Sequence, residues 1–214
     1  MQCSSPLRPP GRREARKEER RDAILDVAAC SFLERGYAGT TMSAIASALG
    51  GSKGTLWSYF PSKDVLFAAV LERASRAFRA ELELSLNENE GLEPALLKVS
   101  ESLIGKMTSE AAVALHRLVV GEARRFPEVG RIFYENAPQR TLELMAFHFA
   151  KAMDAGLLRR ADPFQTAQYF VSLCTARSHI RLLTGVCASL SPAEVREQAG
   201  SAVDLFLRAF RPDA

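Results

Sequence analysis

The sequence of 214 residues has few cysteines, and the four present (Cys3, Cys30, Cys174 and Cys187) lie far apart. None forms a Cys-x-x-Cys pair or a Cys/His spacing typical of zinc sites, so we expect neither a disulfide framework nor a bound metal. Scattered cysteines suit a reducing compartment, and we expect most of them to be buried as small apolar residues.

Long hydrophobic runs are also absent, since no apolar segment approaches the roughly 18 residues needed to cross a bilayer. Residues 1–21 carry prolines and arginines where a secretory signal would have an apolar core. The sequence shows no P-loop, no GxGxxG, and no nucleophile–base pair, which disfavours an enzyme with a known motif. No segment has strand periodicity bounded by hairpin turns, and no cofactor is indicated, so we expect an all-helical protein.

The net positive charge of the chain is concentrated near the N-terminus. Through Leu66 there are ten Lys/Arg and seven Asp/Glu, a net charge of +3, and the remaining 18 basic and 18 acidic residues cancel. The whole positive excess therefore lies in the first third, where we expect a polyanionic partner. Hydrophobic residues make up 47% of the sequence, which is enough for a core of ordinary size.

Residues 1–18 combine Pro, Gly and Arg and predict a flexible basic arm, either a solvated tail or a segment that adds phosphate contacts. From Arg20 a four-residue spacing of apolar positions predicts a helix that ends at Gly36. These apolar positions are Ile24, Leu25, Ala28, Ala29, Phe32 and Leu33. Two short helices should follow, one from the N-cap Thr41 to Leu49 and one over residues 53–59, separated by Gly50 and Gly51.

Longer helices are expected over about 62–86, 93–107, 110–125, 128–154, 162–186 and 191–210, which gives about nine in total. The last two have the clearest starts. Asp162-Pro163 and Ser191-Pro192 each place a capping residue before a proline, with Gln or Glu at the third helical position.

Two short helices joined by a glycine-containing turn predict a helix-turn-helix. In this motif the second helix enters the major groove by its N-terminal end, which needs small or hydrogen-bonding residues. Residues Ser52 to Thr55 have this character, and Trp57, Ser58, Tyr59 and Lys63 could donate to flanking phosphates. The apolar residues expected to hold the two helices together are Ile45, Ala46, Leu49 and Leu56.

The segment TTMSAIASALGGSKGTLWSYFPSK (Thr40–Lys63) resembles the DNA-binding domain of the tetracycline-repressor (TetR) family, and residues 20–67 match it throughout. The resemblance implies that Thr41, Tyr59 and Lys63 contact phosphates. It also implies a base-reading surface that comprises Ser43, Ser52, Lys53, Gly54, Thr55 and Ser58. Two positions depart from the family pattern, because Gly51 replaces a small apolar residue and Trp57 replaces the common Tyr.

The family couples this domain, expected here over residues 19–66, to a larger helical domain that dimerises and binds a small ligand, expected over residues 67–214. Leu115–Arg140 resembles the C-terminal domain of one TetR subgroup. The resemblance places a cavity between the middle helices, with Arg177 or His116 as a polar anchor, although Met and aromatic residues at this spacing equally suit a core. The candidate ligand-binding residues are Phe78, Leu103, Met107, His116, Val119, Phe133, Met145, Phe149, Phe170 and Arg177.

Apolar stripes on the last two predicted helices suit a dimer interface, but they suit an intramolecular core equally well. Two recognition helices about one DNA turn apart, roughly 34–36 Å or a multiple of it, would favour the dimer. The stripe residues assigned to the interface are Leu173, Ala176, Ile180, Leu183, Val195, Ala199, Val203, Phe206 and Phe210.

The sequence thus predicts a homodimeric transcriptional regulator that acts on nucleoid DNA in the cytoplasm, without a membrane partner. We expect a repressor that a small, mostly apolar or aromatic ligand releases from a palindromic operator. One alternative is a DNA-bound scaffold that recruits a protein partner and has no small-molecule switch. The other is an enzyme whose scattered Ser and His residues converge in the helical pocket.

Overall fold

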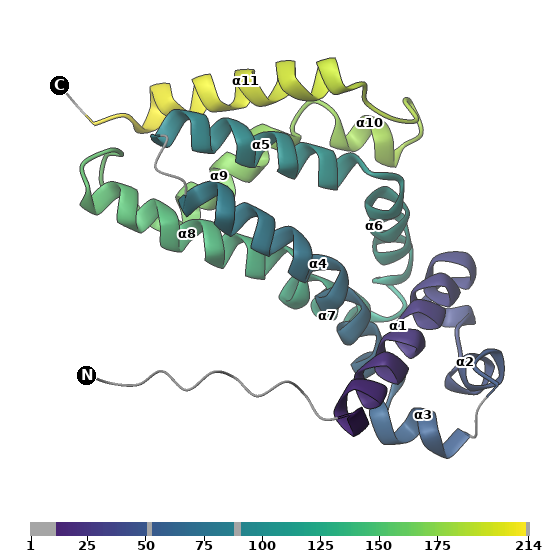
Figure 1. Cartoon of the computed structure of the whole chain (residues 1–214). Helices are drawn as coiled ribbons and strands as arrows, with labels where there is room; N and C mark the ends of the chain where they lie inside the picture. The colour runs from purple at the N-terminus through teal and green to yellow at the C-terminus, as the bar shows by residue number, and fades with distance from the viewer. Residues whose placement is uncertain (1–11, 51–52, 88–90, 213–214) are drawn as a thin grey trace, which may run out of the picture. The chain divides into compact units, whose positions relative to one another are not determined.

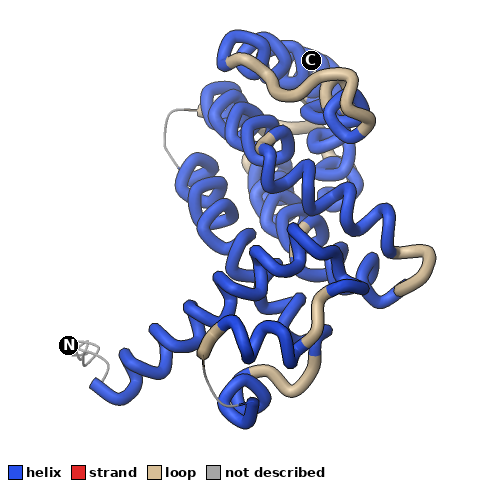
Figure 2. Tube along the Cα trace, turned by 90° about the vertical axis from the view of Figure 1, so that its right-hand side faces the viewer, coloured by secondary structure: helices blue, strands red, loops and turns tan. Residues whose placement is uncertain are grey.

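A computed structural model describes residues 12–50, 53–87 and 91–212 of the chain. In this part of the chain every regular element is a helix, as Figure 2 shows, so the all-helical expectation is confirmed. The chain divides into two compact units, with the boundary between Val70 and Leu71. None of the described helices is both long and apolar enough to cross a membrane.

The first unit consists of three helices and the start of a fourth (Figure 1). They are α1 (Arg12–Gly39), α2 (Met42–Ala48), α3 (Lys53–Tyr59) and α4 (Lys63–Asn87). The first helix begins at Arg12 rather than at Arg20, because the Arg, Lys, Glu and Ala residues that precede Arg20 all have high helix propensity. Residues 12–18 of the expected arm are thus helical, and residues 1–11 lie outside the described part.

The sequence predicted that this helix ends at Gly36, whereas α1 is kinked at Gly36 and extends to Gly39. The φ of 71° and ψ of 175° at Gly36 are available to glycine at little steric cost. Directly after this kink, the ring of Tyr37 is buried in the core. It stacks on Phe32, with ring centroids 5.9 Å apart, and makes an edge contact with Phe67, with centroids 5.3 Å apart. Leu33, expected on the apolar face of this helix, is instead exposed.

The second unit is a helical bundle built on the remainder of α4. Its other helices are α5 (Leu92–Thr108), α6 (Glu110–Glu122), α7 (Pro127–Asn136), α8 (Pro138–Asp154), α9 (Pro163–Thr175), α10 (His179–Leu183) and α11 (Pro192–Phe210). The last helix packs on α5 and α9, and α9 packs on α8 and α5. Phe149, Phe170 and Phe206 meet at the centre, with ring centroids between 5.0 and 5.8 Å apart.

The described part contains eleven helices rather than about nine, because two of the expected helices are broken. The segment 128–154 divides at Pro138, which has no N–H to donate and whose ring would clash with a preceding carbonyl inside a continuous helix. The segment 162–186 divides after Thr175. There the buried amide of Gln198 on α11 donates to the Cys174 carbonyl (2.5 Å) and to Ser178 Oγ (2.9 Å).

Both strong helix starts predicted from the sequence are confirmed. The Asp162 carboxylate accepts a hydrogen bond from the Gln165 N–H at 2.6 Å at the start of α9. At the start of α11, Ser191 and Glu194 form a reciprocal capping box.

The expectation that most cysteines are buried is wrong for the described residues. Cys174 is buried, Cys187 is half-buried and Cys30 is exposed, whereas Cys3 lies outside the described residues. Burial raises the pKa of the Cys174 thiol to about 12, so this thiol stays protonated.

Candidate DNA-binding surface and ligand cavity

The helix-turn-helix is formed by α2 and α3, which pack against each other. Thr41 caps α2, because its hydroxyl oxygen accepts a hydrogen bond from the Ala44 N–H at 3.1 Å. Gly50 follows α2 with a φ of 62°, a left-handed conformation that favours glycine. The predicted packing residues Ile45, Ala46 and Leu56 are buried, and Leu49 is half-buried.

The side chains predicted to contact DNA lie on or beside these two helices. Ser43, Gly54, Trp57 and Ser58 are exposed, and Thr41 is exposed at the N-cap of α2. Thr55, Tyr59 and Lys63 are half-buried. Lys53 is the first residue of α3, whereas Ser52 and Gly51 lie outside the described residues.

Hydrogen bonds within α3 limit what Ser58 can offer to DNA. Its hydroxyl donates to the Thr55 carbonyl at 2.7 Å. A serine hydroxyl has a single proton, so in this arrangement Ser58 presents only oxygen lone pairs. Lone pairs repel phosphate oxygens but accept from base amino groups. A contact from Ser58 to phosphate would therefore require its hydroxyl to rotate away from the helix.

Lys63, which the family resemblance assigns to phosphate contact, also binds within the first unit. Its Nζ donates to the backbone oxygen of Tyr37 at 2.8 Å and lies 4.0 Å from the centroid of the Tyr37 ring. The Tyr37 hydroxyl in turn donates to the Asp64 carboxylate. Lys63 and Asp64, at the start of α4, thus hold the end of α1 in place. The motif match did not reveal this role of Tyr37, although an aromatic residue directly after the helix-ending Gly36 was a signal for it.

Thr40 contributes a second internal link that sequence reasoning missed. Its side chain is almost fully buried, and its hydroxyl lies 2.9 Å from the Ser31 carbonyl and 2.7 Å from the Gly36 carbonyl. The two carbonyls share this donor at the kink in α1, so the position of the Thr41 cap relative to α1 is fixed. The Thr40–Thr41 pair therefore combines a buried anchor with an exposed cap.

The second unit contains a partly open cavity of about 190 Å³. Four alanines (Ala74, Ala111, Ala112 and Ala137) contribute to its lining from α4, α6 and the α7–α8 junction, and their short side chains leave space that larger residues would fill. The other lining residues are Leu71, Ser75, Phe78, Leu103, Lys106, Met107, Leu115, His116, Phe133, Pro138, Thr141, Leu142 and Val171. The walls are therefore mainly aliphatic and aromatic, with a few polar side chains.

Five of the ten candidate ligand-binding residues line this cavity, namely Phe78, Leu103, Met107, His116 and Phe133. The other five lie elsewhere. Met145, Phe149 and Phe170 belong to the main core, and Val119 is buried away from the cavity. Arg177 is exposed and pairs with Glu197 at 3.1 Å, so it is not the polar anchor of the cavity.

His116 is the polar side chain of the cavity that the sequence did identify. Its Nδ1 lies 2.9 Å from the Ala112 carbonyl, and its ring meets Phe133 and His179 edge-on at 5.0 and 4.9 Å. Burial lowers the pKa of His116, the hydrogen bond to Ala112 opposes this shift, and the charge of His179 adds to it. The neutral imidazole is therefore favoured. Lys106, the other strongly polar lining residue, was not anticipated.

The residues assigned to a dimer interface separate into two groups. Ala199, Val203, Phe206 and Phe210 are buried within the chain itself, because this face of α11 packs on α5 and α9. Leu173, Leu183 and Val195 are half-buried, whereas Ala176 and Ile180 are exposed. The stripe on α11 is thus an intramolecular core, the alternative that the pattern had left open.

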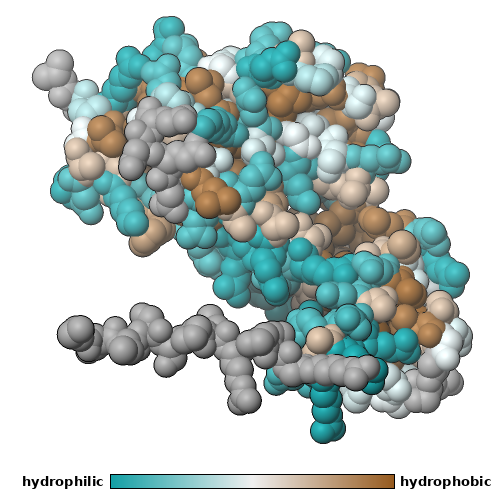
Figure 3. Space-filling model, in the orientation of Figure 1, coloured by the Kyte–Doolittle hydropathy of each residue, from teal (hydrophilic) through white to brown (hydrophobic). Residues whose placement is uncertain are grey.

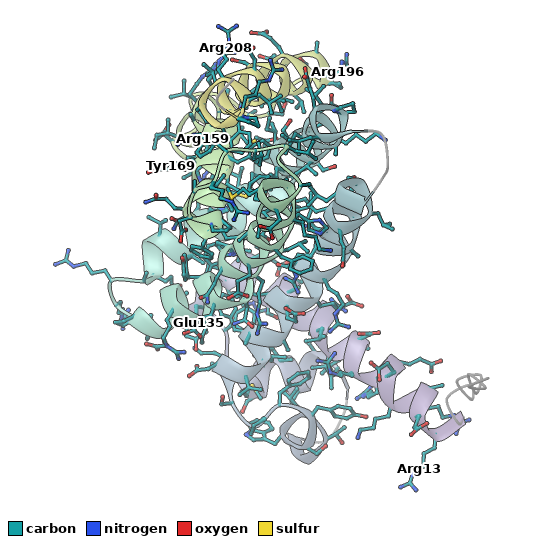
Figure 4. All side chains as sticks on the ribbon, turned by 90° about the vertical axis from the view of Figure 1, so that its left-hand side faces the viewer. Arg13, Glu135, Arg159, Tyr169, Arg196 and Arg208 are labelled. Carbon is teal, nitrogen blue, oxygen red and sulfur yellow. The ribbon has the colours of Figure 1, made fainter. Side chains whose placement is uncertain are left out.

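Other apolar side chains remain exposed around these helices. Leu205 on α11 is 51% exposed and Tyr169 on α9 is 50% exposed. In Figure 4 the side chain of Tyr169 lies at the edge of the bundle, and those of Arg196 and Arg208 project outward from α11. On the face shown in Figure 3, hydrophobic residues form small patches between hydrophilic ones.

Two family models match the chain. Residues 24–70 match the family described as bacterial regulatory proteins of the tetR family. Residues 94–212, more than half of the chain, match the C-terminal domain of AefR-like transcriptional repressors.

Individual relatives agree with this assignment. The solved structure of a TetR-family regulator from Mesorhizobium loti is 28% identical, with a TM-score of 0.79 over 92% of this chain and 98% of that one. The flavonoid-responsive regulator FrrA is 30% identical, with a TM-score of 0.77 over 92% of this chain and all of the other. The repressor ComR of Escherichia coli K12 is 35% identical over 91 residues, which span 42% of this chain and 43% of ComR.

The match thus extends over both units, from the helix-turn-helix to the end of the helical bundle. The protein belongs to the TetR family, whose members are DNA-binding transcriptional regulators and not enzymes.

Proposed function

We propose that this chain is a homodimeric repressor that a small ligand releases from a palindromic operator in the cytoplasm. The observation that carries the proposal is the cavity of about 190 Å³ in the same chain as the helix-turn-helix. Apolar walls with few polar groups are typical of ligand sites. Phe78 and Phe133 in the lining favour a mostly apolar or aromatic ligand. FrrA, a relative 30% identical over 92% of this chain, is described as flavonoid-responsive.

The DNA-binding surface in this proposal comprises the ten residues that the sequence predicted. Thr41, Tyr59 and Lys63 contact phosphates, and Trp57 donates its indole N–H to the backbone beside them. The base-reading residues are Ser43, Ser52, Lys53, Gly54, Thr55 and Ser58. Repression is favoured over activation because ComR and the AefR-like family are described as repressors.

Dimerisation is assigned to the exposed sides of α9, α10 and α11. Ile180 is 61% exposed and Leu205 is 51% exposed, so each would bury apolar surface against a second copy. A two-fold contact of this kind is isologous and presents two recognition helices to a palindromic site. Among the predicted interface residues, Ala176 and Ile180 are exposed and Leu183 is half-buried, whereas the half-buried Leu173 and Val195 also pack against the core of the chain.

Release follows from a shift between two states of the dimer. The ligand must bind the state that does not fit the operator more tightly than the state that does, because equal affinity for both would shift nothing. The helix α4 begins in the unit that binds DNA, and four of its later residues, Leu71, Ala74, Ser75 and Phe78, line the cavity. A ligand that contacts this segment thus acts on a helix shared by both units.

Selection of bound duplexes from a random DNA pool tests the proposal, with the purified full-length chain at near-physiological salt. We expect enrichment of a palindrome whose half-sites are separated by about one helical turn or a multiple of it. Retention of DNA without sequence enrichment, which disappears at higher salt, would contradict a sequence-specific operator. An enriched site without two-fold symmetry would contradict the dimer.

A further inference from the structure

The polar side chains of the cavity differ in the ligand groups that they can bind. Four lining side chains are polar, namely Ser75, Lys106, His116 and Thr141. No Asp or Glu occurs among the described lining residues, so Lys106 carries a positive charge with no carboxylate beside it in the cavity wall. This electrostatic arrangement disfavours a cation and favours an acidic ligand.

Lys106 is half-buried in the cavity wall, and among the described residues only the Ala74 carbonyl accepts a hydrogen bond from its solvent-exposed ammonium group. Its Nζ donates to the Ala74 carbonyl at 3.2 Å and lies 5.9 Å from the centroid of the Phe78 ring. An ammonium group has three donors, and the Ala74 carbonyl engages one of them. The others can therefore bind an acidic oxygen of a ligand, and charge-assisted hydrogen bonds of this kind are stronger than neutral ones.

Unlike Lys106, which donates hydrogen bonds, His116 can accept a hydrogen bond from a ligand. The Ala112 carbonyl can only accept, so the nearby Nδ1 of His116 carries a proton. In the neutral ring, Nε2 is then an acceptor, and the described residues supply no hydrogen bond to it. A ligand hydroxyl could donate to Nε2. Protonation of the ring would remove this acceptor, and burial of His116 opposes that protonation.

The cavity has room for a small ring system. An engineered cavity of about 150 Å³ holds benzene. A volume of about 190 Å³ therefore suits one ring or two fused rings with small substituents. The aromatic side chains of Phe78 and Phe133 can pack on such rings face-on or edge-on.

We propose that the cavity binds a hydroxylated aromatic acid of one or two rings, with its acidic oxygen on Lys106 and its hydroxyl donating to His116. This inference rests on the proposed function, because it takes the cavity to be the effector site. Its new content is the chemical class of the effector and the two residues that select it. Ser75 and Thr141 are left to bind substituents or water.

Calorimetric titration of the full-length chain with matched naphthalene compounds tests this proposal. The probes are naphthoate, the isomers of hydroxynaphthoate, methylnaphthalene and naphthylmethylammonium, which share a ring system and differ in charge and hydroxyl content. We expect naphthoate to bind at least about tenfold more tightly than methylnaphthalene, and the cation to bind more weakly than both. At least one hydroxynaphthoate isomer should bind more tightly than naphthoate.

Substitutions identify the residues that cause these differences. Lys106→Met keeps an apolar side chain of similar length and should reduce the affinity for naphthoate about tenfold, without changing that for methylnaphthalene. His116→Phe keeps an aromatic ring and should remove the advantage of hydroxynaphthoate over naphthoate. Lys98→Met, an exposed position on the same helix as Lys106, is the matched control and should bind all probes as the wild type does.

The outcomes separate this inference from the proposed function. Equal binding of methylnaphthalene and naphthoate, no effect of Lys106→Met, or no binding of any probe would each overturn the assignment of an aromatic acid. Operator binding measured on the same protein would still report on the repressor function. Conversely, tight binding of hydroxynaphthoate to a chain that selects no operator would support the ligand class and contradict the repressor.

Discussion

The Lys63 ammonium donates to the backbone oxygen of Tyr37 at 2.8 Å and lies over the Tyr37 ring, 4.0 Å from its centroid. Lys63 begins α4, and Tyr37 follows the kink at Gly36 in α1. The cation–π contact and the hydrogen bond thus connect two helices of the DNA-binding unit. The residue that the family resemblance assigns to phosphate contact is therefore also part of the internal structure of that unit.

Lys63→Ala should lower both stability and DNA affinity. Loss of the hydrogen bond and the cation–π contact should reduce the free energy of unfolding by about 1–2 kcal/mol. Loss of a phosphate contact should weaken binding to operator and to random DNA by the same factor. Chemical denaturation and fluorescence anisotropy measure the two effects. A variant as stable as the wild type would show that the contact with Tyr37 contributes nothing.

Tyr59→Phe should affect DNA binding alone. The half-buried ring, whose centroid lies 6.5 Å from that of Phe60, stays in place, while the hydroxyl proposed to contact phosphate is lost. We expect affinity to fall about three- to tenfold on all sequences, with an unchanged melting temperature. A change in base preference, measured by repeating the duplex selection, would instead place this hydroxyl against a base.

Thr55→Val should change which bases are preferred. The position lies in the first turn of α3, the end that enters the major groove in a helix-turn-helix. The hydrogen bond from Ser58 ends on the Thr55 backbone, so it survives the substitution. Duplex selection with this variant should return a palindrome altered at one or two positions in each half-site. Ser47→Ala on the exposed side of α2 is the control, and an equal loss on specific and random DNA for Thr55→Val would contradict base reading.

Stability should decrease as the pH falls below about 6.5. Burial lowers the pKa of His116, His148 and His179, so the unfolded chain takes up protons at a pH where the folded chain does not. The stability that depends on neutral histidines is complete above the unfolded pKa and is lost as the pH falls towards the folded values. Urea unfolding at about pH 7.5 and about pH 5.5 measures the difference. His116→Phe should make the loss smaller, and an unchanged loss would exclude His116 as a contributor.

On α11, Leu205 should contribute to dimerisation, whereas its neighbour Phe206 should contribute to folding stability. Leu205 is exposed, so Leu205→Glu should leave the fold intact but shift the dimer towards monomer and abolish operator binding. Phe206 is fully buried, so Phe206→Ala should reduce the free energy of unfolding by about 3–5 kcal/mol. Sedimentation and thermal unfolding distinguish the two effects. If Leu205→Glu stays dimeric, the proposed interface is wrong.

Local signals in the sequence predicted the helix-turn-helix and the helix starts. The Thr41 cap, the break at Gly50 and the Ser191–Glu194 capping box each depend on residues within a few positions of one another. Such features follow from backbone geometry and need no knowledge of the tertiary fold. The break at Pro138 depends on an equally local signal, the proline itself, although the sequence analysis placed one continuous helix over residues 128–154.

Features that depend on long-range packing could not be predicted. The break after Thr175 is stabilised by Gln198, which reaches the Cys174 carbonyl from a different helix. In the sequence, the alanines of the cavity cannot be distinguished from ordinary helix-forming residues. Their role in leaving space depends on how α4, α6 and the α7–α8 junction are arranged around the cavity. The stripe that ends at Phe210 could equally have packed on a partner or on its own chain, because periodicity defines a face without identifying its neighbour.

The most direct test of the proposed repressor is the mass of its complex with the selected operator, measured by native mass spectrometry with and without a cavity ligand. We expect two chains per duplex, or a multiple of two, in the absence of ligand. Addition of a hydroxynaphthoate isomer that calorimetry shows to bind should yield free duplex and free dimer. One chain per duplex, or a complex that stays intact when the ligand saturates the protein, would contradict the ligand-released dimer.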